Sequence, residues 1–391
     1  MAPAHPRGNQ APAGGIVKFR VPGHLLKIAP YVSGKPIEEA ERQLGMRQVV
    51  KLASNENPLG PSPRALEAIR EGAGRAHRYP DSQGHDLRHA LSGRLHLPVD
   101  QIVLGNGSTE LVEILSKAFL SRERGAVVAD QSFIMYSIAV RAMGAPLKLV
   151  ALKDYRHDLE AMAAACRDTT ALVYIANPNN PTGTHVTRAA FDAYFRSVPR
   201  HVLTVVDEAY RDYVEAPDYP DCLEDLRNGR NVVVLRTFSK IHGLAGMRIG
   251  YAATVKEVAQ ALDGVRSPFN TSVLAQAAAR AALDDVHHVA LSKAENSQEA
   301  TFLGTELARR GVRFVPSVAN FFLVFTPQKG EEVYQALLRL GVIVRPMEAY
   351  GFDRAIRVSV GLRTENERFL DALDHTAVGA SGRARKSYRV S

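Results

Sequence analysis

Short apolar runs alternate with amphipathic stretches through the middle of the chain, from about residue 101 to residue 265. The apolar runs predict buried strands, and the stretches between several of them carry apolar residues at helical spacing. Strands that alternate with helices predict an α/β fold, in which helices cover both faces of a mostly parallel sheet. The expected strands are Gln101–Gly105, Ala126–Ala129, Leu147–Ala151, Ala171–Ala176, Val202–Asp207, Val232–Arg236 and Ile249–Ala253.

The regular alternation weakens after residue 265. A helix-rich stretch from Ser272 to Gly311 is followed by fewer strand candidates, which are Ala319–Val324, Val342–Val344 and Ile356–Val360. This pattern predicts a smaller α+β domain.

Before the first expected strand, Ser62 and Pro63 form a helix start, because serine caps a helix and proline suits its first position. A second helix is expected at about Gly84 to Arg94.

A chain of 391 residues is longer than a single core usually organises, so two domains are expected. Residues 1–20 are expected to be a disordered leader, and residues 21–60 an arm that joins the small domain. The large domain is expected at 61–270, the small domain at 271–376 and a basic tail at 377–391. In such sheets ligands bind outside the carboxyl ends of the strands, so functional residues are expected where strands end.

The net charge of +8 suggests a nucleic-acid partner only until its position is considered. Seven of the positive charges lie in the two ends, which contain no acidic residue: Arg7, Lys18, Arg20, Arg383, Arg385, Lys386 and Arg389. The rest of the chain is therefore near +1. We expect no nucleic-acid partner.

Cysteine and hydropathy patterns narrow the class of protein further. Only Cys166 and Cys222 are present, without metal-ligand spacing around them, so neither a disulfide framework nor a metal site is expected. No apolar run approaches the roughly 20 residues of a membrane helix, and the first residues lack the apolar segment of a secretory signal. We expect a cytoplasmic protein without a membrane partner.

Lys240 stands just after the apolar run Val232–Arg236. Burial disfavours the charged form of a lysine, and a neutral amine forms Schiff bases with carbonyl compounds. The nearby hydroxyls of Thr237 and Ser239, with the guanidinium of Arg248, suit a phosphate group. A Schiff-base lysine beside a phosphate site indicates pyridoxal 5′-phosphate, although an ordinary lysine in a surface turn also fits this stretch.

Ser108 and Thr109 follow the first expected strand, in a turn that opens an amphipathic helix at Gly105–Glu110. The first turn of a helix offers free N–H groups and a favourable dipole to an anion. The two glycines of this turn lack the third glycine of a dinucleotide fingerprint, and no phosphate-binding loop of the Gly-Lys-Ser/Thr type is present. A purely structural turn remains an alternative.

Polar or aromatic residues also follow three further strands. Phe133 is suited to stack on a flat ring or to pack in a core. The loop Asn177–Gly183 holds two prolines and directs Asn180, whose amide suits a phenolate oxygen. Asp207 ends an apolar run, where a carboxylate needs a cationic partner such as a protonated pyridine nitrogen. Tyr210, three residues later, suits the oxygen of the same ring.

Together these motifs resemble the fold-type-I pyridoxal-phosphate aminotransferases, and they are most similar to the histidinol-phosphate branch. The resemblance covers roughly residues 25–375 and predicts a large domain with a seven-stranded, mostly parallel sheet beside a smaller α+β domain. It is carried by Asn55–Pro58, Arg78–Pro80, Gly107–Glu110, Asn177–Gly183, Asp207–Tyr210, Ser239-Lys240 and Ile356–Gly361.

The resemblance implies a role for each cofactor residue. Lys240 would form the Schiff base, Asp207 would face the pyridine nitrogen, and Asn180 and Tyr210 would bind the phenolic oxygen. Phe133 stands where the branch often has a tyrosine stacked on the ring. The phosphate would be held by Ser108, Thr109, Thr237, Ser239 and Arg248. Tyr79 matches a tyrosine that reaches the cofactor phosphate of the partner subunit, which implies a homodimer.

The resemblance also implies the substrate contacts. Arg357 matches the arginine that binds the acidic group of the substrate, and Tyr31, Asn57 and Arg345 match further substrate contacts. Arg363 is a departure, because the branch commonly has acidic residues after Gly361. This added cation either favours a dianionic substrate or faces solvent.

The expected reaction is the transfer of an amino group from L-histidinol phosphate to 2-oxoglutarate, in histidine biosynthesis. Imidazole acetol phosphate and glutamate are its products. An aromatic aminotransferase for phenylalanine or tyrosine shares nearly every motif, and a phospho-amino-acid decarboxylase shares the fold. The sequence alone leaves these alternatives open.

Overall fold

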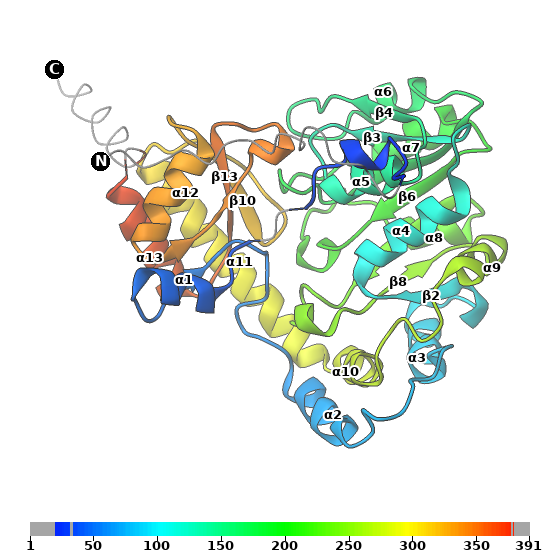
Figure 1. The fold of residues 1–391 in the computed structure, drawn as a ribbon, viewed down its shortest axis with the longest axis horizontal. Helices are drawn as coiled ribbons and strands as arrows, with labels where there is room; N and C mark the ends of the chain where they lie inside the picture. Colours follow the sequence, from blue (N-terminus) through cyan, green and yellow to red (C-terminus); the bar gives the residue numbers. More distant parts are fainter. Residues whose placement is uncertain (1–19, 32–33, 377, 379–391) are drawn as a thin grey trace.

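The computed structural model describes residues 20–31, 34–376 and 378. The expected leader, apart from Arg20, and the expected tail, apart from Val378, lie outside the described residues. The described chain forms a larger body and a smaller body that lie side by side (Figure 1). Within it, no helix has both the length and the apolar character that crossing a bilayer requires.

The larger body is built on a seven-stranded sheet, as expected from the sequence. Neighbouring strands pair in parallel except at β8, which runs antiparallel to both of its neighbours. Each expected strand of the alternating region is present, with bounds shifted by at most a few residues. The strands in spatial order are β2 (Ile102–Gly105), β8 (Gly250–Ala253), β7 (Val232–Thr237), β6 (Leu203–Asp207), β5 (Thr170–Ala176), β3 (Gly125–Ala129) and β4 (Leu147–Val150).

Apolar side chains point to both faces of this sheet. Along β5, Val173 and Ile175 enter one core, while Leu172 and Tyr174 enter the other. This explains why the central strands read as continuous apolar runs. The first core is covered by α2 (Pro63–Ala73), α3 (His85–Leu95), α6 (Leu159–Ala164), α7 (Arg188–Ser197), α8 (Cys222–Arg227) and α10 (Val273–Asp284). The second is covered by α4 (Gly107–Phe119), α5 (Ile134–Ala142) and α9 (Lys256–Val265).

Helix α2 begins where the sequence predicts. The side chain of Ser62 accepts a hydrogen bond from the backbone N of Ala65, and Pro63 occupies the first helical position. The cap satisfies one of the N–H groups that a helix start leaves without a partner.

The smaller body contains the strands expected in the C-terminal part of the chain. An antiparallel sheet orders its strands β12 (Arg345–Pro346), β13 (Ala355–Ser359), β10 (Phe321–Phe325) and β9 (Phe314–Val315). A parallel pair joins β1 (Val50–Lys51) to β11 (Val342–Ile343), so the N-terminal arm enters this body. Its helices are α1 (Ile37–Leu44), α11 (Val286–Arg309), α12 (Gly330–Arg339) and α13 (Arg363–Asp374).

The core residues also bear on the domain boundary. The sequence suggests a boundary after residue 270, but Ala275 and Ala278 of α10 pack in a core of the large sheet. Leu303 and Leu307 of α11 pack in the core of the smaller body. We propose that the large domain continues through α10 and that the small domain begins within α11.

The start of the described chain contacts the large domain before the arm enters the small one. A short helical turn, Leu25–Lys27, lies beside α5 in Figure 1. Nε2 of His24 is 3.3 Å from the backbone oxygen of Ala142 at the end of α5. The arm therefore links the two domains.

Candidate active site

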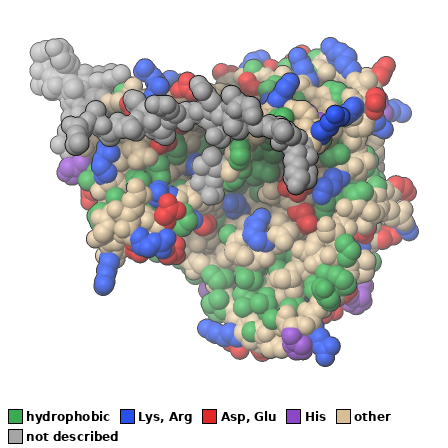
Figure 2. All heavy atoms as spheres, viewed as in Figure 1, with side chains coloured by type: hydrophobic (Ala, Val, Ile, Leu, Met, Phe, Trp, Pro, Cys, Tyr) green, Lys and Arg blue, Asp and Glu red, His purple; other side chains and the backbone are tan. Residues whose placement is uncertain are grey.

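A cavity of about 250 Å³ lies between the two domains, at the carboxyl ends of the central strands. The face seen in Figure 2 is hollowed there, with basic side chains in the hollow. The cavity brings together thirteen of the fifteen site residues expected from the sequence. They are Tyr31, Ser108, Thr109, Phe133, Asn180, Asp207, Tyr210, Thr237, Ser239, Lys240, Arg248, Arg345 and Arg357.

One end of the cavity groups hydrogen-bond donors that suit a phosphate group. Ser108 and Thr109 lie in the first turn of α4, whose backbone N–H groups have no partner within the helix. Gly107 has a φ of +76°, and a Cβ at this position would lie 2.5 Å from Nη2 of Arg248. Glycine is therefore needed for the guanidinium to approach the helix start.

Hydroxyl groups from the end of β7 complete this end of the cavity. Oγ1 of Thr237 donates to Oγ of Ser239 at 2.9 Å. Nη1 of Arg248 donates to the same Ser239 oxygen at 3.3 Å. Hydroxyls, a guanidinium and a helix N-terminus are the donors that a phosphate dianion requires.

Asp207 ends β6 inside the cavity, with only 5% of its surface exposed. Burial raises the pKa of its carboxyl group from 3.8 to about 6, although hydrogen bonds from Tyr136 and from the backbone N of Ala209 oppose the shift. The Tyr136 hydroxyl donates to Oδ2 at 2.9 Å. A buried carboxylate of this kind is stabilised by a cationic partner in the cavity.

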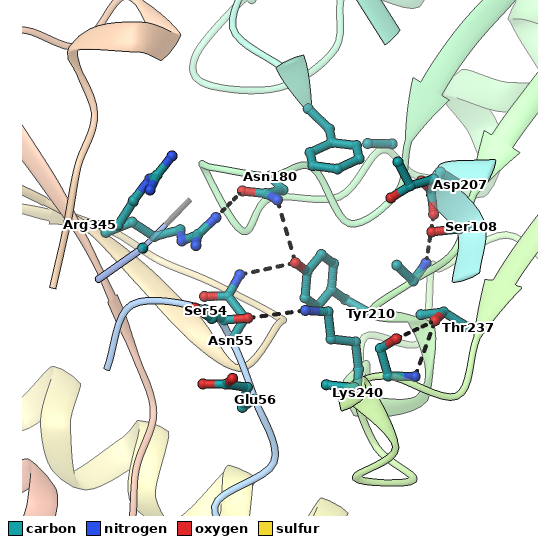
Figure 3. Close-up of a pocket in the computed structure, with 18 of the residues that line it drawn as sticks. Ser54, Asn55, Glu56, Ser108, Asn180, Asp207, Tyr210, Thr237, Lys240 and Arg345 are labelled. Carbon is teal, nitrogen blue, oxygen red and sulfur yellow. Dashed lines mark hydrogen bonds between the residues drawn. The ribbon is translucent and has the colours of Figure 1, made fainter. Parts of the chain in front are cut away.

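Lys240 directs its amine into the centre of the cavity (Figure 3). Nζ donates to the backbone oxygen of Ser54 at 3.2 Å and lies 5.4 Å from the centre of the Tyr210 ring. Ser54 belongs to the segment that follows β1, so the lysine bridges the two domains. A carbonyl compound bound in this cavity would lie next to the Lys240 amine, which could attack it as a nucleophile.

Tyr210 and Asn180 line the same cavity and lie next to each other. Nδ2 of Asn180 is 3.4 Å from Oη of Tyr210. Arg357 reaches this pair from the small domain, since its Nη1 donates to Oδ1 of Asn180 at 2.6 Å. These groups can donate hydrogen bonds to an oxygen of a bound ring.

Arg345 and Arg357 occupy directly opposite positions on the antiparallel strands β12 and β13. Both line the cavity. Cζ of Arg345 is 5.4 Å from the centre of the Tyr31 ring, and Nη2 of Arg357 donates to the backbone oxygen of Ala53 at 2.7 Å. The small domain thus brings two cations to the cavity.

The geometry fits a phosphorylated pyridine aldehyde. The helix start and hydroxyls suit the phosphate, the Asp207 carboxylate suits a protonated ring nitrogen, and the Lys240 amine suits the aldehyde. The Asp207 carboxylate tests this fit most directly. It is buried, so it needs a cationic partner, and a protonated ring nitrogen would supply that charge.

A family model for class I and II aminotransferases matches residues 47–373 of the chain. The chain belongs to the class I and II aminotransferase family. The expectation of an aminotransferase is confirmed. Because aminotransferases of this family act with pyridoxal 5′-phosphate, the cofactor expected from the sequence is confirmed as well.

Individual relatives cover nearly the whole aminotransferase chain. Histidinol-phosphate aminotransferase of Moorella thermoacetica is 45% identical over 368 residues, which are 94% of this chain and 95% of the relative. The enzyme of the same name from an Anaeromyxobacter species is 48% identical over 355 residues, 90% of this chain and 98% of the relative. The crystal structure of histidinol-phosphate aminotransferase from Sinorhizobium meliloti, in complex with pyridoxal-5′-phosphate, is 31% identical with a TM-score of 0.83. That comparison covers 95% of this chain and 100% of the other.

Two expected site residues of this aminotransferase do not line the cavity. The amide of Asn57 donates to the backbone oxygen of Ile241 and to Oγ of Ser292, so it ties the arm to neighbouring elements rather than facing a substrate. Tyr79 is 82% exposed and stacks on Phe269, with ring centres 4.7 Å apart. The contact of Tyr79 with a partner subunit stays a prediction, because the structure contains one chain.

Arg363 forms an ion pair with the buried carboxylate of Glu299 at 2.8 Å, and its Cζ lies 3.8 Å from the centre of the Phe302 ring. Of the two alternatives considered from the sequence, the solvent-facing one is closer to the structure, because 43% of the Arg363 side chain is exposed. It joins α13 to α11 and does not line the cavity, although part of its side chain remains exposed.

Tyr136 and Asn55 are among the cavity residues that sequence reasoning missed. Tyr136 follows Phe133 by three residues in a helix start, and this spacing could have indicated that both face the same site. Asn55 lies in the same motif as Asn57, but nothing in the motif reveals which of the two amides faces the cavity. In the structure Asn55 donates to Tyr210 at 3.0 Å.

Proposed function

We propose that this aminotransferase transfers the amino group of L-histidinol phosphate to 2-oxoglutarate, forming imidazole acetol phosphate and glutamate in histidine biosynthesis. The observation that carries the proposal is the opposed pair Arg345 and Arg357 at the cavity. Like charges directly opposite each other on neighbouring strands repel, so an anion between them is a stabilising ligand. The names of the curated relatives support the same substrate.

A phosphate suits this pair of arginines better than a carboxylate. Each guanidinium donates a forked pair of hydrogen bonds, and a phosphate dianion has enough acceptor oxygens for both. Nε of Arg357 is buried and has no hydrogen-bond partner among the described residues. A buried donor without a partner costs free energy, which a bound anion would recover.

The cofactor-binding residues have separate tasks in this proposal. Asp207 holds the positive charge of the ring nitrogen, Asn180 and Tyr210 bind the ring oxygen, and Phe133 covers a ring face. When bound, pyridoxal 5′-phosphate supplies a sink for the electrons released at the substrate carbon. The phosphate group of the cofactor is held by the first turn of α4, with Ser108 and Thr109, and by Thr237, Ser239 and Arg248.

Lys240 is the catalytic residue of the proposal. Its amine lies in the centre of the cavity, between the Tyr210 ring and the Ser54 carbonyl oxygen. Once free, this amine takes up the proton that leaves the substrate carbon and later returns it, as a general base and then a general acid. Arg345, Arg357 and Tyr31 hold the anionic end of the substrate during these transfers.

The active form is proposed to be a homodimer in the cytoplasm. Tyr79 is 82% exposed and Phe269 is 43% exposed, and such a stacked aromatic pair on a surface suits an interface. In the dimer, Tyr79 would reach the cofactor phosphate of the partner subunit. Both cysteines are buried and unpaired, which supports a reducing compartment.

The reaction is tested by incubating the purified holoenzyme with histidinol phosphate and 2-oxoglutarate and identifying the products by mass spectrometry. Equal amounts of imidazole acetol phosphate and glutamate support the proposal. Efficient conversion of phenylalanine or tyrosine, with little conversion of histidinol phosphate, would favour an aromatic aminotransferase. Carbon dioxide released from a phospho-amino acid without a keto acid would favour a decarboxylase.

A further inference from the structure

The hydroxyl group of Tyr210 lies between two amides that come from different parts of the chain (Figure 3). Nδ2 of Asn55 is 3.0 Å from Oη of Tyr210, and Nδ2 of Asn180 is 3.4 Å from the same atom. All three side chains are buried. Since bulk water does not compete there, the other partners of each amide decide which of its atoms faces the tyrosine.

Arg357 fixes the orientation of Asn180. A guanidinium group can only donate hydrogen bonds. Because Nη1 of Arg357 lies 2.6 Å from the side chain of Asn180, the atom that receives this bond must be Oδ1. The NH2 group of Asn180 therefore faces Tyr210 and donates to its oxygen.

Ser359, at the end of β13, orients Asn55 in a similar way. The backbone N of Asn55 donates to Oγ of Ser359 at 2.8 Å, and this hydroxyl donates to Oδ1 of Asn55 at 3.0 Å. If the amide were reversed, the buried serine proton would lose its acceptor, which costs free energy. The NH2 group of Asn55 is thereby directed at Tyr210.

The backbone of Asn55 is also suited to this task. Its φ is +53°, in the left-handed region that asparagine tolerates better than most residues. Its carbonyl oxygen accepts a hydrogen bond from Nδ2 of Asn320 at 3.1 Å. The side chain of Asn55 is thus aimed by contacts at both its backbone and its amide.

Two incoming donors leave the hydroxyl proton of Tyr210 for a third group. Within the described part of the chain, no residue accepts that proton. Tyr210 lines the cavity beside the amine of Lys240. The proton is therefore available to an acceptor oxygen bound in the cavity.

We propose that Asn55 is a positioning residue that makes Tyr210 a dedicated hydrogen-bond donor to the phenolic oxygen of the cofactor. This inference rests on the proposed function, which assigns Tyr210 to that oxygen. Asn55 and Ser359 lie on the small-domain side, whereas Tyr210 follows β6 of the large sheet. The bond from Asn55 therefore couples the donor strength of Tyr210 to the position of the small domain.

The test is the pH midpoint of the visible absorbance change of the holoenzyme. A donor to the phenolic oxygen stabilises its negative charge and disfavours uptake of a proton nearby, so losing the donor raises the midpoint. We expect Tyr210→Phe to raise it by about one to two pH units. Asn55→Asp, which offers the Tyr210 proton a competing acceptor, should approach this shift.

Asn55→Gly removes the amide and keeps a backbone that tolerates a positive φ. It should raise the midpoint by less than Asn55→Asp, because Asn180 still donates to Tyr210. In the double variant Asn55→Gly/Tyr210→Phe, the midpoint should equal that of Tyr210→Phe alone, since Asn55 acts through the tyrosine. Glu299→Gln is the matched control, as it perturbs the small domain at Arg363 and should leave the midpoint unchanged.

Three results would overturn the inference, and they differ in what else they affect. If Tyr210→Phe shifts the midpoint while neither Asn55 variant does, Asn55 has no positioning role and the proposed function stands. If Tyr210→Phe itself leaves the midpoint unchanged, the assignment of Tyr210 to the phenolic oxygen also fails. A shift in Glu299→Gln as large as in the Asn55 variants would show a general effect of the small domain and would likewise contradict the specific role.

Discussion

Arg357 of the small domain donates a hydrogen bond to Asn180 of the large domain, with 2.6 Å between Nη1 and Oδ1. One guanidinium therefore serves two parts of the site. It holds the amide that is proposed to bind the cofactor oxygen, and its buried Nε remains available to an anion. In this arrangement, a substrate anion that binds Arg357 also acts on the hydrogen bonds around the cofactor.

Arg345 distinguishes the two candidate substrates, because it is proposed to bind the substrate anion and lines the cavity beside Tyr31. Arg345→Ala should weaken histidinol phosphate by at least about ten-fold, since Arg345 is only partly buried and hydrogen bonds to a charged group contribute about 1.5–3 kcal/mol. Phenylalanine should be affected much less. Single-turnover rates with both amines measure the two losses, and equal losses would favour the aromatic reading.

Asp207 gives the cofactor-free protein a specific pH dependence. Its pKa is about 6 in the folded chain and 3.8 ordinarily, so the folded state binds the proton more tightly. The free energy of unfolding therefore falls as pH rises through this interval, and Asp207→Asn lacks that loss. Between pH 4 and pH 7, the variant should gain about 2 kcal/mol of stability relative to the wild type.

Urea unfolding of both cofactor-free proteins at several pH values measures this difference. Comparing the variant with the wild type cancels the other titrating groups. A difference that does not change with pH would mean that Asp207 is not a buried, proton-binding carboxyl group.

Lys240→Ala should still bind the cofactor phosphate, because the cradle at Ser239 and Arg248 is unchanged. It should lose multiple turnover, since neither the nucleophilic amine nor the proton carrier remains. Stopped-flow absorbance and steady-state assays check both statements. Borohydride treatment of the wild type, followed by peptide mapping, should locate the reduced cofactor on Lys240. Label on another lysine would contradict the assignment.

Tyr79 is expected to act in the neighbouring subunit, and mixed dimers test this directly. Tyr79→Ala and Lys240→Ala should each be nearly inactive alone. In a random mixture of the two, half of the dimers contain one of each subunit, and one site in each such dimer is complete. We expect recovery of about a quarter of the wild-type activity. No recovery, with hybrid dimers confirmed by native mass spectrometry, would place Tyr79 outside the partner's site.

The large sheet was predictable because each strand is a short apolar run that ends at a polar motif. Val232–Thr237 followed by Ser239 and Lys240 is typical, since the change from apolar to polar residues marks both the strand end and the site. It was less predictable which of the two domain cores a helix packs against. The alanines of α10 fit either core, and only the packing reveals that they belong to the large sheet.

The site itself was predictable where a residue's chemistry depends on its own motif, as for Lys240 and Asp207. It was not predictable where the role depends on a distant partner. Asn55 and Tyr210 are 155 positions apart, and the opposed arginines depend on the register of β12 and β13. The first contact arises from the docking of the two domains and the second from strand pairing within the small domain, and no local pattern encodes either.

The most direct test of the proposed substrate is a competition between two amines. The wild-type holoenzyme is mixed with equal concentrations of histidinol phosphate and phenylalanine, together with 2-oxoglutarate, and the two keto products are quantified at early times. The phosphate site proposed at Arg345 and Arg357 predicts that imidazole acetol phosphate predominates. Predominance of phenylpyruvate would contradict the account.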